Sequence, residues 1–293
     1  MMFESFATRR IAVNGTEIHL RIGGSGPPLL LLHGYPQTHV MWHKLAPALA
    51  RRFTVVCPDV RGYGDSGKPA SEDTHRAYAK RSSAADMAGV MSALGFETFQ
   101  LAGHDRGGRV AYRLALDHPA RVTRLAVLDI VPTVEQYERM GVSGAQASFH
   151  WYFLTQPAPL PERLIGADPE FFLRNLTSRW AITPGCFDPA ALAEYIRCFC
   201  DPATIHATCE DYRAGYAIDR ALDFEDRAAG RKIECPVLAL WGERGAPGKD
   251  VAVLEVWKNW CVDVRGHGVP GGHFLPEEAP EETLAAFEGF FVG

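Results

Sequence analysis

The 293-residue sequence has few of the features that define membrane, secreted or nucleic-acid-binding proteins. It has no apolar run of about 20 residues, the length needed to cross a bilayer. Its first ten residues have no apolar segment of the kind found in secretory signals. It also has no basic block, and its net charge of −5 argues against nucleic acid and anionic membranes as partners. We therefore expect a soluble cytoplasmic protein.

Cysteine is sparse. The seven cysteines are an odd number in a large chain, which is typical of reduced thiols and not of a disulfide framework. Cys198, Cys200, His206 and Cys209 lie close together in the sequence. Their spacing matches no common zinc pattern, and the surrounding residues follow an amphipathic helical pattern. We predict no metal site there, and no cofactor.

Continuously apolar segments alternate with helical patterns through most of the chain. This alternation predicts an α/β fold, with a mostly parallel sheet covered by helices on both faces. A hairpin that turns at Asn14-Gly15 is predicted near the N-terminus. The predicted strands are residues 28–32, 53–58, 99–103, 124–131, 235–242 and 262–264, and the predicted helices are residues 42–51, 82–94, 105–118, 250–260 and 280–291.

The alternation stops after Pro132. From residue 134 to residue 231, aromatic-rich helical patterns are interrupted by prolines, and no buried strand is evident. We interpret this stretch as a helical cap domain inserted into the α/β fold. The core domain then comprises residues 1–133 and 232–293.

The segment Gly103-His104-Asp105-Arg106-Gly107 joins a predicted strand to a predicted helix. Glycines two positions before and after the central residue are typical of the nucleophile elbow. Here the central residue is Asp105, where a serine would favour acyl transfer. A carboxylate that displaces a leaving group from a saturated carbon forms an ester on the enzyme, which water can hydrolyse at the carboxyl carbon. The alternative is that Asp105 only caps the helix.

Asp105, Asp129 and His273 follow one another in the nucleophile–acid–histidine order of the α/β-hydrolases. His273 lies in a glycine-rich loop before the last predicted helix and would deprotonate the hydrolytic water. His267 is a less favoured base because it lies at a strand end. A structural loop histidine is the alternative for His273.

Asp129 ends a predicted strand, where its carboxylate can orient the imidazole of His273. Many α/β-hydrolases take this acid from the loop after the next strand. In this sequence that loop offers only Glu243 before Asp250, so we favour Asp129. The alternative is that Asp129 caps the next segment.

Two arginines follow the nucleophile closely. Guanidinium groups of Arg106 and Arg109 beside an anionic nucleophile favour a substrate carboxylate, held by paired hydrogen bonds. If Arg109 instead pairs with a core acid, the site would prefer neutral haloalkanes or epoxides. The backbone N–H groups of Tyr35 and Arg106 are the expected oxyanion hole.

The predicted cap contains three ring-bearing donors, His150, Trp151 and Tyr212. If they converge, they can stabilise a leaving halide, fluoride most of all. Aromatic residues are equally common in the core of a cap. The residues alone leave both interpretations open.

The motifs Gly-His-Asp-Arg-Gly-Gly-Arg, Phe-His-Trp-Tyr and Asp-Tyr-Arg-Ala-Gly resemble those of the fluoroacetate (haloacetate) dehalogenases, a family of α/β-hydrolases. The resemblance extends from His33 to His273 and implies a metal-independent homodimer that converts fluoroacetate to glycolate and fluoride. It implies Asp105 as nucleophile, His273 as base, Asp129 as acid, Arg106 and Arg109 on the substrate carboxylate, and His150, Trp151 and Tyr212 on the halide.

Two other functions remain open. A soluble epoxide hydrolase shares the aspartate nucleophile and the His-Gly-x-Pro turn, and needs two cap tyrosines. Tyr152, Tyr212 and Tyr216 are available, but the paired arginines would have no purpose. A non-catalytic ligand receptor is the third hypothesis, against which the complete set of nucleophile, acid and base argues.

Overall fold

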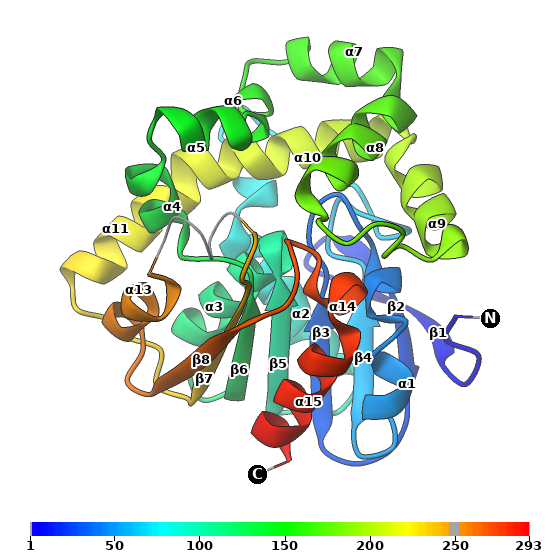
Figure 1. Ribbon diagram of the computed structural model, residues 1–293, viewed down its shortest axis with the longest axis vertical. Helices are drawn as coiled ribbons and strands as arrows, with labels where there is room; N and C mark the ends of the chain where they lie inside the picture. The colour runs from blue at the N-terminus through cyan, green and yellow to red at the C-terminus, as the bar shows by residue number, and fades with distance from the viewer. Residues whose placement is uncertain (1, 246–251, 293) are drawn as a thin grey trace.

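A central eight-stranded sheet organises the protein, in the order β1-β2-β4-β3-β5-β6-β7-β8 (Figure 1). The computed structural model describes residues 2–245 and 252–292. Strands β1, β2 and β4 pair antiparallel, and the remaining neighbours pair in parallel. The predicted α/β class is confirmed. The strands are β1 (Ala7–Val13), β2 (Thr16–Gly23), β3 (Pro28–Leu32), β4 (Thr54–Pro58), β5 (Phe99–His104), β6 (Val122–Leu128), β7 (Val237–Gly242) and β8 (Val264–Val269).

The predicted hairpin forms at the N-terminal edge of the sheet. Asn14 and Gly15 have φ angles of 45° and 72°, as a two-residue turn between β1 and β2 requires. The prediction was less accurate at the other edge, where β8 begins and ends later than residues 262–264. Its sequence, Val-Arg-Gly-His-Gly-Val, has two glycines, which weaken the strand pattern.

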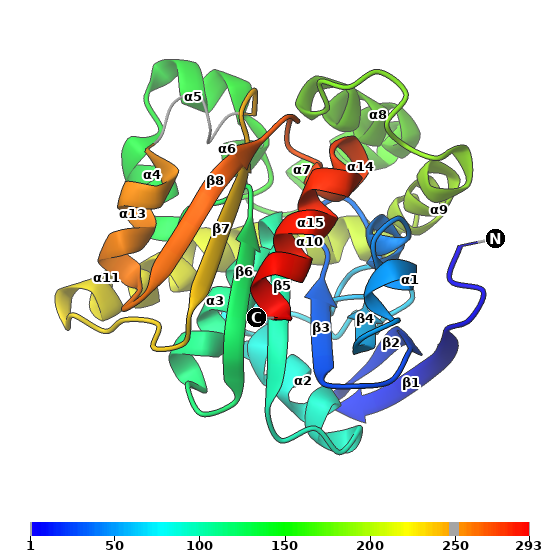
Figure 2. The same cartoon turned by 60° about the horizontal axis from the view of Figure 1, so that its bottom comes forward.

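Helices cover both faces of the sheet (Figure 2). α2 (Lys80–Ala93) and α3 (Asp105–Asp117) lie on one face, and α1 (Ala46–Leu49) and α15 (Pro280–Phe291) on the other. The predicted helix 42–51 is instead the 3₁₀ turn η1 (His39–Trp42) followed by the single turn α1. α13 (Val253–Trp260) matches the end of the predicted helix 250–260, whose first residues lie outside the described part of the chain.

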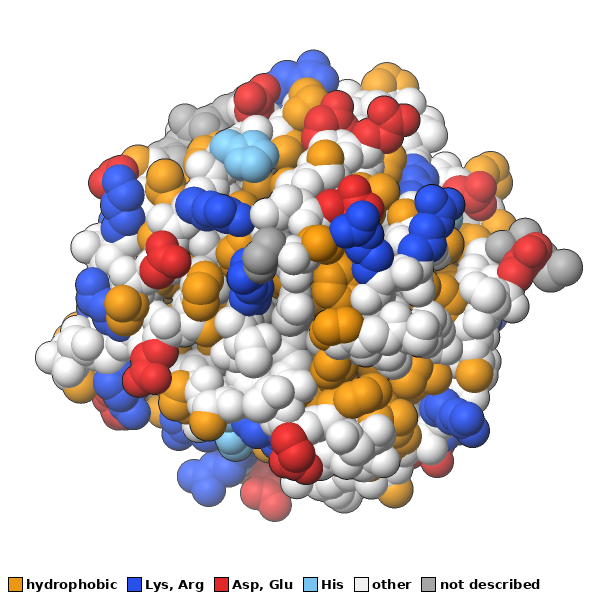
Figure 3. Space-filling model, turned by 90° about the horizontal axis from the view of Figure 1, so that it is seen from below, with side chains coloured by type: hydrophobic (Ala, Val, Ile, Leu, Met, Phe, Trp, Pro, Cys, Tyr) orange, Lys and Arg blue, Asp and Glu red, His pale blue; other side chains and the backbone are white. Residues whose placement is uncertain are grey.

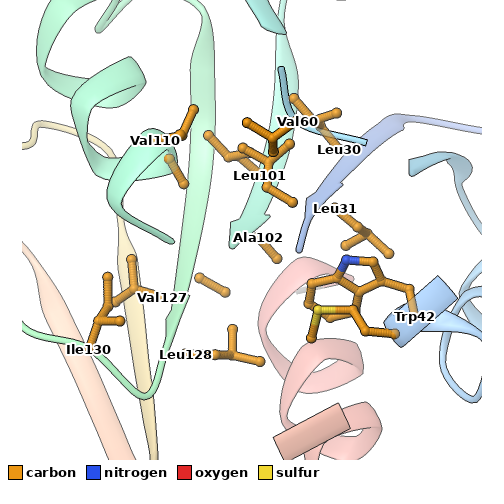
Figure 4. Packing of buried hydrophobic residues seen from close by; sticks show 14 of the residues in the cluster. Leu30, Leu31, Trp42, Val60, Leu101, Ala102, Val110, Val127, Leu128 and Ile130 are labelled. Atoms are coloured by element: carbon orange, nitrogen blue, oxygen red, sulfur yellow. The ribbon is translucent and has the colours of Figure 1, made fainter. Parts of the chain in front are cut away.

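The core fills both sides of the parallel strands. Leu101 and Ala102 are neighbours on β5, and their side chains point to opposite faces (Figure 4). Leu101 lies on the side of Val110 from α3, and Ala102 on the side of Trp42 from η1. All four side chains are buried, with at most 1% of their surface exposed. This packing fixes the carboxyl end of β5, from which the candidate nucleophile follows.

The described chain between β6 and β7 is helical, as the lack of strand patterns predicted. These helices gather at one end of the sheet (Figure 1). The division into domains at residues 134 and 231 stays a prediction. The helices are α4 (Thr133–Arg139), α5 (Val142–Ala147), α6 (His150–Phe153), α7 (Leu160–Ala167), α8 (Pro169–Trp180), α9 (Pro189–Phe199), α10 (Pro202–Ala214), the π-helical turn η3 (Gly215–Asp219) and α11 (Arg220–Ala228).

Three of these helices begin with the same pair, an aspartate followed by a proline. In each, the aspartate carboxylate accepts hydrogen bonds from the first free N–H groups, and proline takes the first helical position. The prolines thus start helices, where the sequence pattern suggested breaks. The pairs are Asp168-Pro169 at α8, Asp188-Pro189 at α9 and Asp201-Pro202 at α10.

Charged side chains of both signs are interspersed on the face seen from below (Figure 3). That face therefore presents no broad surface of one sign. None of the helices in the described residues is both long and apolar enough to traverse a bilayer. All seven cysteines are described, and each is a free thiol.

Candidate active site

The turn from β5 into α3 holds Asp105 in a left-handed conformation, with φ 47°. A Cβ atom on Gly103 would lie 2.5 Å from the carbonyl oxygen of Gly107, and one on Gly107 would lie 2.2 Å from that of His33. Only glycine fits at either position. A strained non-glycine residue persists where its surroundings impose the strain, and such residues cluster at active sites. The turn therefore has the geometry of a nucleophile elbow.

A cavity of about 330 Å³ opens above Asp105. Residues from the helical stretch between β6 and β7 line it together with residues from outside that stretch, so these helices complete a site that begins at the carboxyl ends of the strands. The lining residues are Asp105, Arg109, Asp129, Gln136, Ala147, Ser148, His150, Trp151, Arg179, Trp180, Ile182, Arg244, Gly245 and His273.

The two carboxylate oxygens of Asp105 face different partners. Oδ1 accepts a hydrogen bond from the backbone N–H of Tyr35 at 2.9 Å. Oδ2 lies 4.0 Å from Nε2 of His273. Burial alone would raise the pKa of Asp105, but nearby positive charges, His273 first, outweigh it and lower the pKa. Asp105 is therefore ionised at neutral pH, and Oδ2 is the oxygen available for attack.

Asp129 and His273 form the pair that their order in the chain predicts. Nδ1 of His273 lies 2.6 Å from Oδ2 of Asp129, whose Oδ1 accepts the N–H of Gly242 at 3.0 Å. Burial would lower the pKa of His273. The hydrogen bond to Asp129 and the charges of Asp129 and Asp105 outweigh burial, so the pKa is raised. His267, the less favoured base, lies on β8 and does not line the cavity.

Arg109 lines the cavity and has no acidic partner in the described residues. Its Nη1 donates to the carbonyl oxygen of Val131 at 2.8 Å and to Oγ1 of Thr133 at 3.3 Å. Its buried Nε has no hydrogen-bond partner in the same part of the chain. The guanidinium lies 4.6 Å from the centre of the Trp151 ring. No acid of the described chain neutralises Arg109, which argues against the alternative of a core ion pair.

Arg106 differs from the expectation because it is already ion-paired and does not line the cavity. Its Nε donates to Oδ2 of Asp211 at 2.8 Å, and its Nη2 donates to the carbonyl oxygen of Asp211 at 2.7 Å. Lys80 also forms an ion pair with Asp211 and lies 3.7 Å from Asp219. Only Nη1 of Arg106 is buried without a partner among the described residues. Arg106 can therefore offer one N–H-bearing nitrogen to a ligand.

The three ring-bearing donors do come together. The ring centre of Tyr212 lies 5.7 Å from that of His150 and 5.9 Å from that of Trp151. Burial lowers the pKa of His150 to about 3, so its ring is neutral and donates one hydrogen bond. Its buried Nδ1 has no partner in the described chain. Buried polar groups are normally satisfied, so an open donor set beside a cavity indicates a ligand.

Sequence reasoning missed the supporting groups around these residues. The hydroxyl of Tyr35 is buried and has no hydrogen-bond partner in the described chain. The ring centres of Tyr35 and Tyr212 lie 5.3 Å apart, so the Tyr35 side chain belongs to the donor cluster. Glu278 accepts hydrogen bonds from the N–H groups of Gly272 and Phe274, on both sides of His273. No local pattern distinguishes Glu278 from other surface acids of a helix.

One His/Asp group in the described residues is compact enough to hold a metal ion, and it lies outside this cavity. Oδ2 of Asp59 is 2.9 Å from Nδ1 of His19, and Oδ1 is 2.8 Å from Nδ1 of His39. The backbone N–H groups of His39 and Asp65 also donate to Asp59. These four donors satisfy the carboxylate as a structural link between strands and loops. Cys198, Cys200, His206 and Cys209 do not form such a group.

Comparison with known proteins places the chain in one family. The family model of the alpha/beta hydrolase fold matches residues 27–280. A fluoroacetate dehalogenase from Burkholderia sp is 46% identical, over 99% of this chain and 95% of that protein. A soluble epoxide hydrolase from Corynebacterium sp. (strain C12) is 34% identical, over 96% of this chain and 95% of that protein.

A solved structure from Nostoc sp PCC 7120, of a protein assigned to the α/β hydrolases, is 55% identical. Its TM-score is 0.97, and the match covers 99% of both chains. The similarity to fluoroacetate dehalogenase that the motifs predicted is confirmed, and the chain belongs to the α/β-hydrolase fold family.

Proposed function

We propose that the protein hydrolyses the carbon–halogen bond of short 2-haloacids, with fluoroacetate as the favoured substrate and glycolate and fluoride as products. The observation that carries this proposal is the cavity that holds both an ionised carboxylate, Asp105, and an arginine without an acidic partner, Arg109. A neutral substrate would leave that buried cation unpaired. The 46% identity to a fluoroacetate dehalogenase supports the same substrate class.

In the first step, Oδ2 of Asp105 attacks the α-carbon from the side opposite the halogen. The carbon–halogen bond breaks, and the halide leaves with both electrons toward His150, Trp151 and Tyr212, which donate hydrogen bonds to it. An ester of glycolate on Asp105 remains. Arg109 holds the substrate carboxylate, and Nη1 of Arg106 is the second donor.

In the second step, Nε2 of His273 takes a proton from water, and the water oxygen attacks Cγ of Asp105. Negative charge develops on Oδ1, the atom that already accepts the N–H of Tyr35. The N–H of Arg106 completes the oxyanion hole. The glycolate oxygen leaves with the proton held by His273, and the carboxyl group of Asp105 releases its remaining proton to solvent. Asp129 keeps the imidazole oriented throughout.

Epoxide hydrolysis is the second candidate because an epoxide hydrolase is 34% identical to the chain. That reaction needs two cap tyrosines directed at the epoxide oxygen. Of the three available, Tyr212 is buried, whereas Tyr152 and Tyr216 are 38% and 43% exposed. None of the three tyrosines is among the lining residues, but the Tyr212 ring packs against His150 and Trp151, which do line the cavity. The geometry therefore favours haloacid hydrolysis.

Fluoride release from fluoroacetate, measured with an ion-selective electrode, tests the proposal. We expect Asp105→Asn to lower the rate by at least about a thousandfold. Diol formation from styrene oxide, measured in parallel, would favour epoxide hydrolysis, and no turnover of either substrate would favour a receptor. A single turnover in ¹⁸O-labelled water should place the label in Asp105, whereas label in glycolate would contradict the ester route.

We further propose that the protein is a cytoplasmic homodimer, with a core domain of residues 1–133 and 232–293 and a cap domain of residues 134–231. Light scattering coupled to size-exclusion chromatography tests the dimer. Fractionation of cells that produce the protein from its own gene tests the cytoplasmic location.

A further inference from the structure

Two more arginines line the cavity that contains Asp105, and both are exposed to solvent. Arg179 lies near the end of α8 in the cap, and Arg244 lies in the segment after β7 in the core. Lining residues that are also exposed mark the open end of a cavity. Arg179 and Arg244 therefore flank its entrance from the two parts of the protein.

Neither guanidinium group has an ion pair or hydrogen bond with the described residues. That of Arg179 lies 5.7 Å from the centre of the Phe149 ring, a contact that orients the side chain without neutralising it. The backbone N–H of Arg244 donates to the carbonyl oxygen of Gly271 at 3.2 Å, which fixes the residue at the entrance.

The acids of the cavity lie at its inner end. Asp105 and Asp129 are the acidic residues that line it, and Asp129 is paired with His273. Asp105 lines the same space as Arg109, whose positive charge helps to lower the pKa of Asp105. With Arg179 and Arg244 added, the lining contains three arginines and two aspartates. The positive charge is thus concentrated toward solvent, where an incoming molecule meets it first.

The field of Arg179 extends into the cavity. Burial is the largest cause of the lowered pKa of His150, and the positive charge of Arg179 contributes to the same lowering. His150 is one of the three donors that would bind the halide. The entrance and the halide-binding cluster are therefore within electrostatic reach of each other.

We propose that Arg179 and Arg244 form an anion-attracting entrance, which draws short carboxylates to the Asp105 site and selects them over neutral haloalkanes and epoxides. The inference rests on the proposed function, because it names the substrate class of the same site. Unpaired cations at the mouth of a cleft raise the local concentration of anions and their rate of capture. The effect decreases when salt shortens the Debye length below about 10 Å.

The kinetic test compares wild type with Arg179→Gln, Arg244→Gln and the double variant. Arg174→Gln is the matched control, because Arg174 lies on α8, is exposed, pairs with Glu170 at 2.8 Å and does not line the cavity. At low ionic strength we expect the double variant to lower kcat/KM for fluoroacetate about three- to tenfold, with kcat within about twofold. At about 0.5 M salt the difference should disappear.

Glycolate binding, measured by titration calorimetry, tests the inference without turnover. The double variant should bind glycolate more weakly than wild type at low salt, while binding of the neutral amide glycolamide stays the same. Equal salt dependence in both proteins, a loss no larger than in Arg174→Gln, or no glycolate binding by wild type would overturn the inference. If glycolate binding depends on the two arginines but no fluoride is released from fluoroacetate, the proposed function is wrong and the inference about the entrance still holds.

Discussion

Asp211 of α10 binds Arg106 of α3 through two atoms, its Oδ2 at 2.8 Å from Nε and its carbonyl oxygen at 2.7 Å from Nη2. Helix α10 thereby holds the residue that follows the nucleophile. Gly215 leaves room for this contact, since a Cβ there would lie 3.0 Å from Nη2 of Arg106. The π-helical turn Gly215–Asp219 starts at the same glycine, and such turns are frequent at functional sites. The orientation of Arg106 is thus fixed before a ligand binds.

Substituting Asp211→Asn should raise KM for fluoroacetate about tenfold and change kcat less than about threefold, because Arg106 loses the carboxylate that orients it and keeps only the contact with the backbone carbonyl oxygen. The control is Asp226→Asn. Asp226 of α11 forms an equally buried ion pair, at 2.5 Å, with Arg113 of α3. Breaking either pair should lower the free energy of unfolding by about 3–5 kcal/mol. A similar KM in the two variants would show that Asp211 is only structural.

Removing the base should separate the two chemical steps. His273→Gln removes the largest of the charges that lower the pKa of Asp105 but keeps those of Arg106 and Arg109. We therefore expect the carboxylate still to attack and one equivalent of fluoride per active site to be released in a burst. The ester then accumulates, and intact-protein mass spectrometry should show one added glycolyl group. Asp105→Asn should give neither signal. If His273→Gln releases no burst, His273 has a role in the first step that this mechanism does not contain.

The charge of Asp105 is one of the causes that raise the pKa of His273. Ester formation removes that charge, so the pKa of His273 should fall in the intermediate, where neutral imidazole is needed. Activity should rise with pH through this pKa, because the protonated ring cannot act as a base. NMR titration should give a lower pKa for His273 in Asp105→Asn than in wild type. An equal or higher value would contradict the coupling.

The halide donors can be tested by changing the halogen. Trp151→Phe removes one N–H while keeping a ring beneath Arg109, whose guanidinium lies 4.6 Å from the ring centre. We expect kcat to fall about 10- to 100-fold for fluoroacetate and less for chloroacetate, because fluoride is the stronger hydrogen-bond acceptor and the poorer leaving group. Equal losses for both substrates would assign Trp151 to packing alone.

The sequence predicts those parts of the protein that depend on neighbouring residues. The elbow follows from Gly103 and Gly107, and the hairpin from Asn14-Gly15, because each turn is determined by local sterics. The helix predicted at residues 42–51 is divided in the structure into the turns η1 and α1, a division that the periodic pattern of the sequence does not indicate.

Residues that act across long separations escaped prediction. Arg106 and Asp211 are 105 positions apart, and no local sequence pattern around either residue predicts that they pair. The sequence therefore suggested two free arginines in the site, whereas the cap holds Arg106 and leaves Arg109 in the cavity. The exposed Arg179 and Arg244 resemble any surface arginine until the fold places them on one cavity.

Glu278 fixes the loop that contains His273 to the end of the cap helix α8. Its carboxylate accepts hydrogen bonds from four backbone N–H groups, two beside His273 and two in the segment after α8. They are the N–H groups of Gly272 at 3.1 Å, Phe274 at 2.9 Å, Ile182 at 2.8 Å and Thr183 at 3.1 Å. The carbonyl oxygen of Trp180 also accepts the N–H of His273 itself, at 3.2 Å.

Substituting Glu278→Gln places an NH₂ group against N–H donors, so the His273 loop should shift. Because only the second step needs His273, kcat should fall about tenfold and KM should fall with it, so that kcat/KM changes little, and fluoride should be released in a burst. Glu277→Gln is the control: Glu277 accepts the hydroxyl of Tyr195 at 2.6 Å, away from the base. It should lower the melting temperature without a burst. A burst in both variants, or in neither, would mean that Glu278 stabilises the fold without positioning the base.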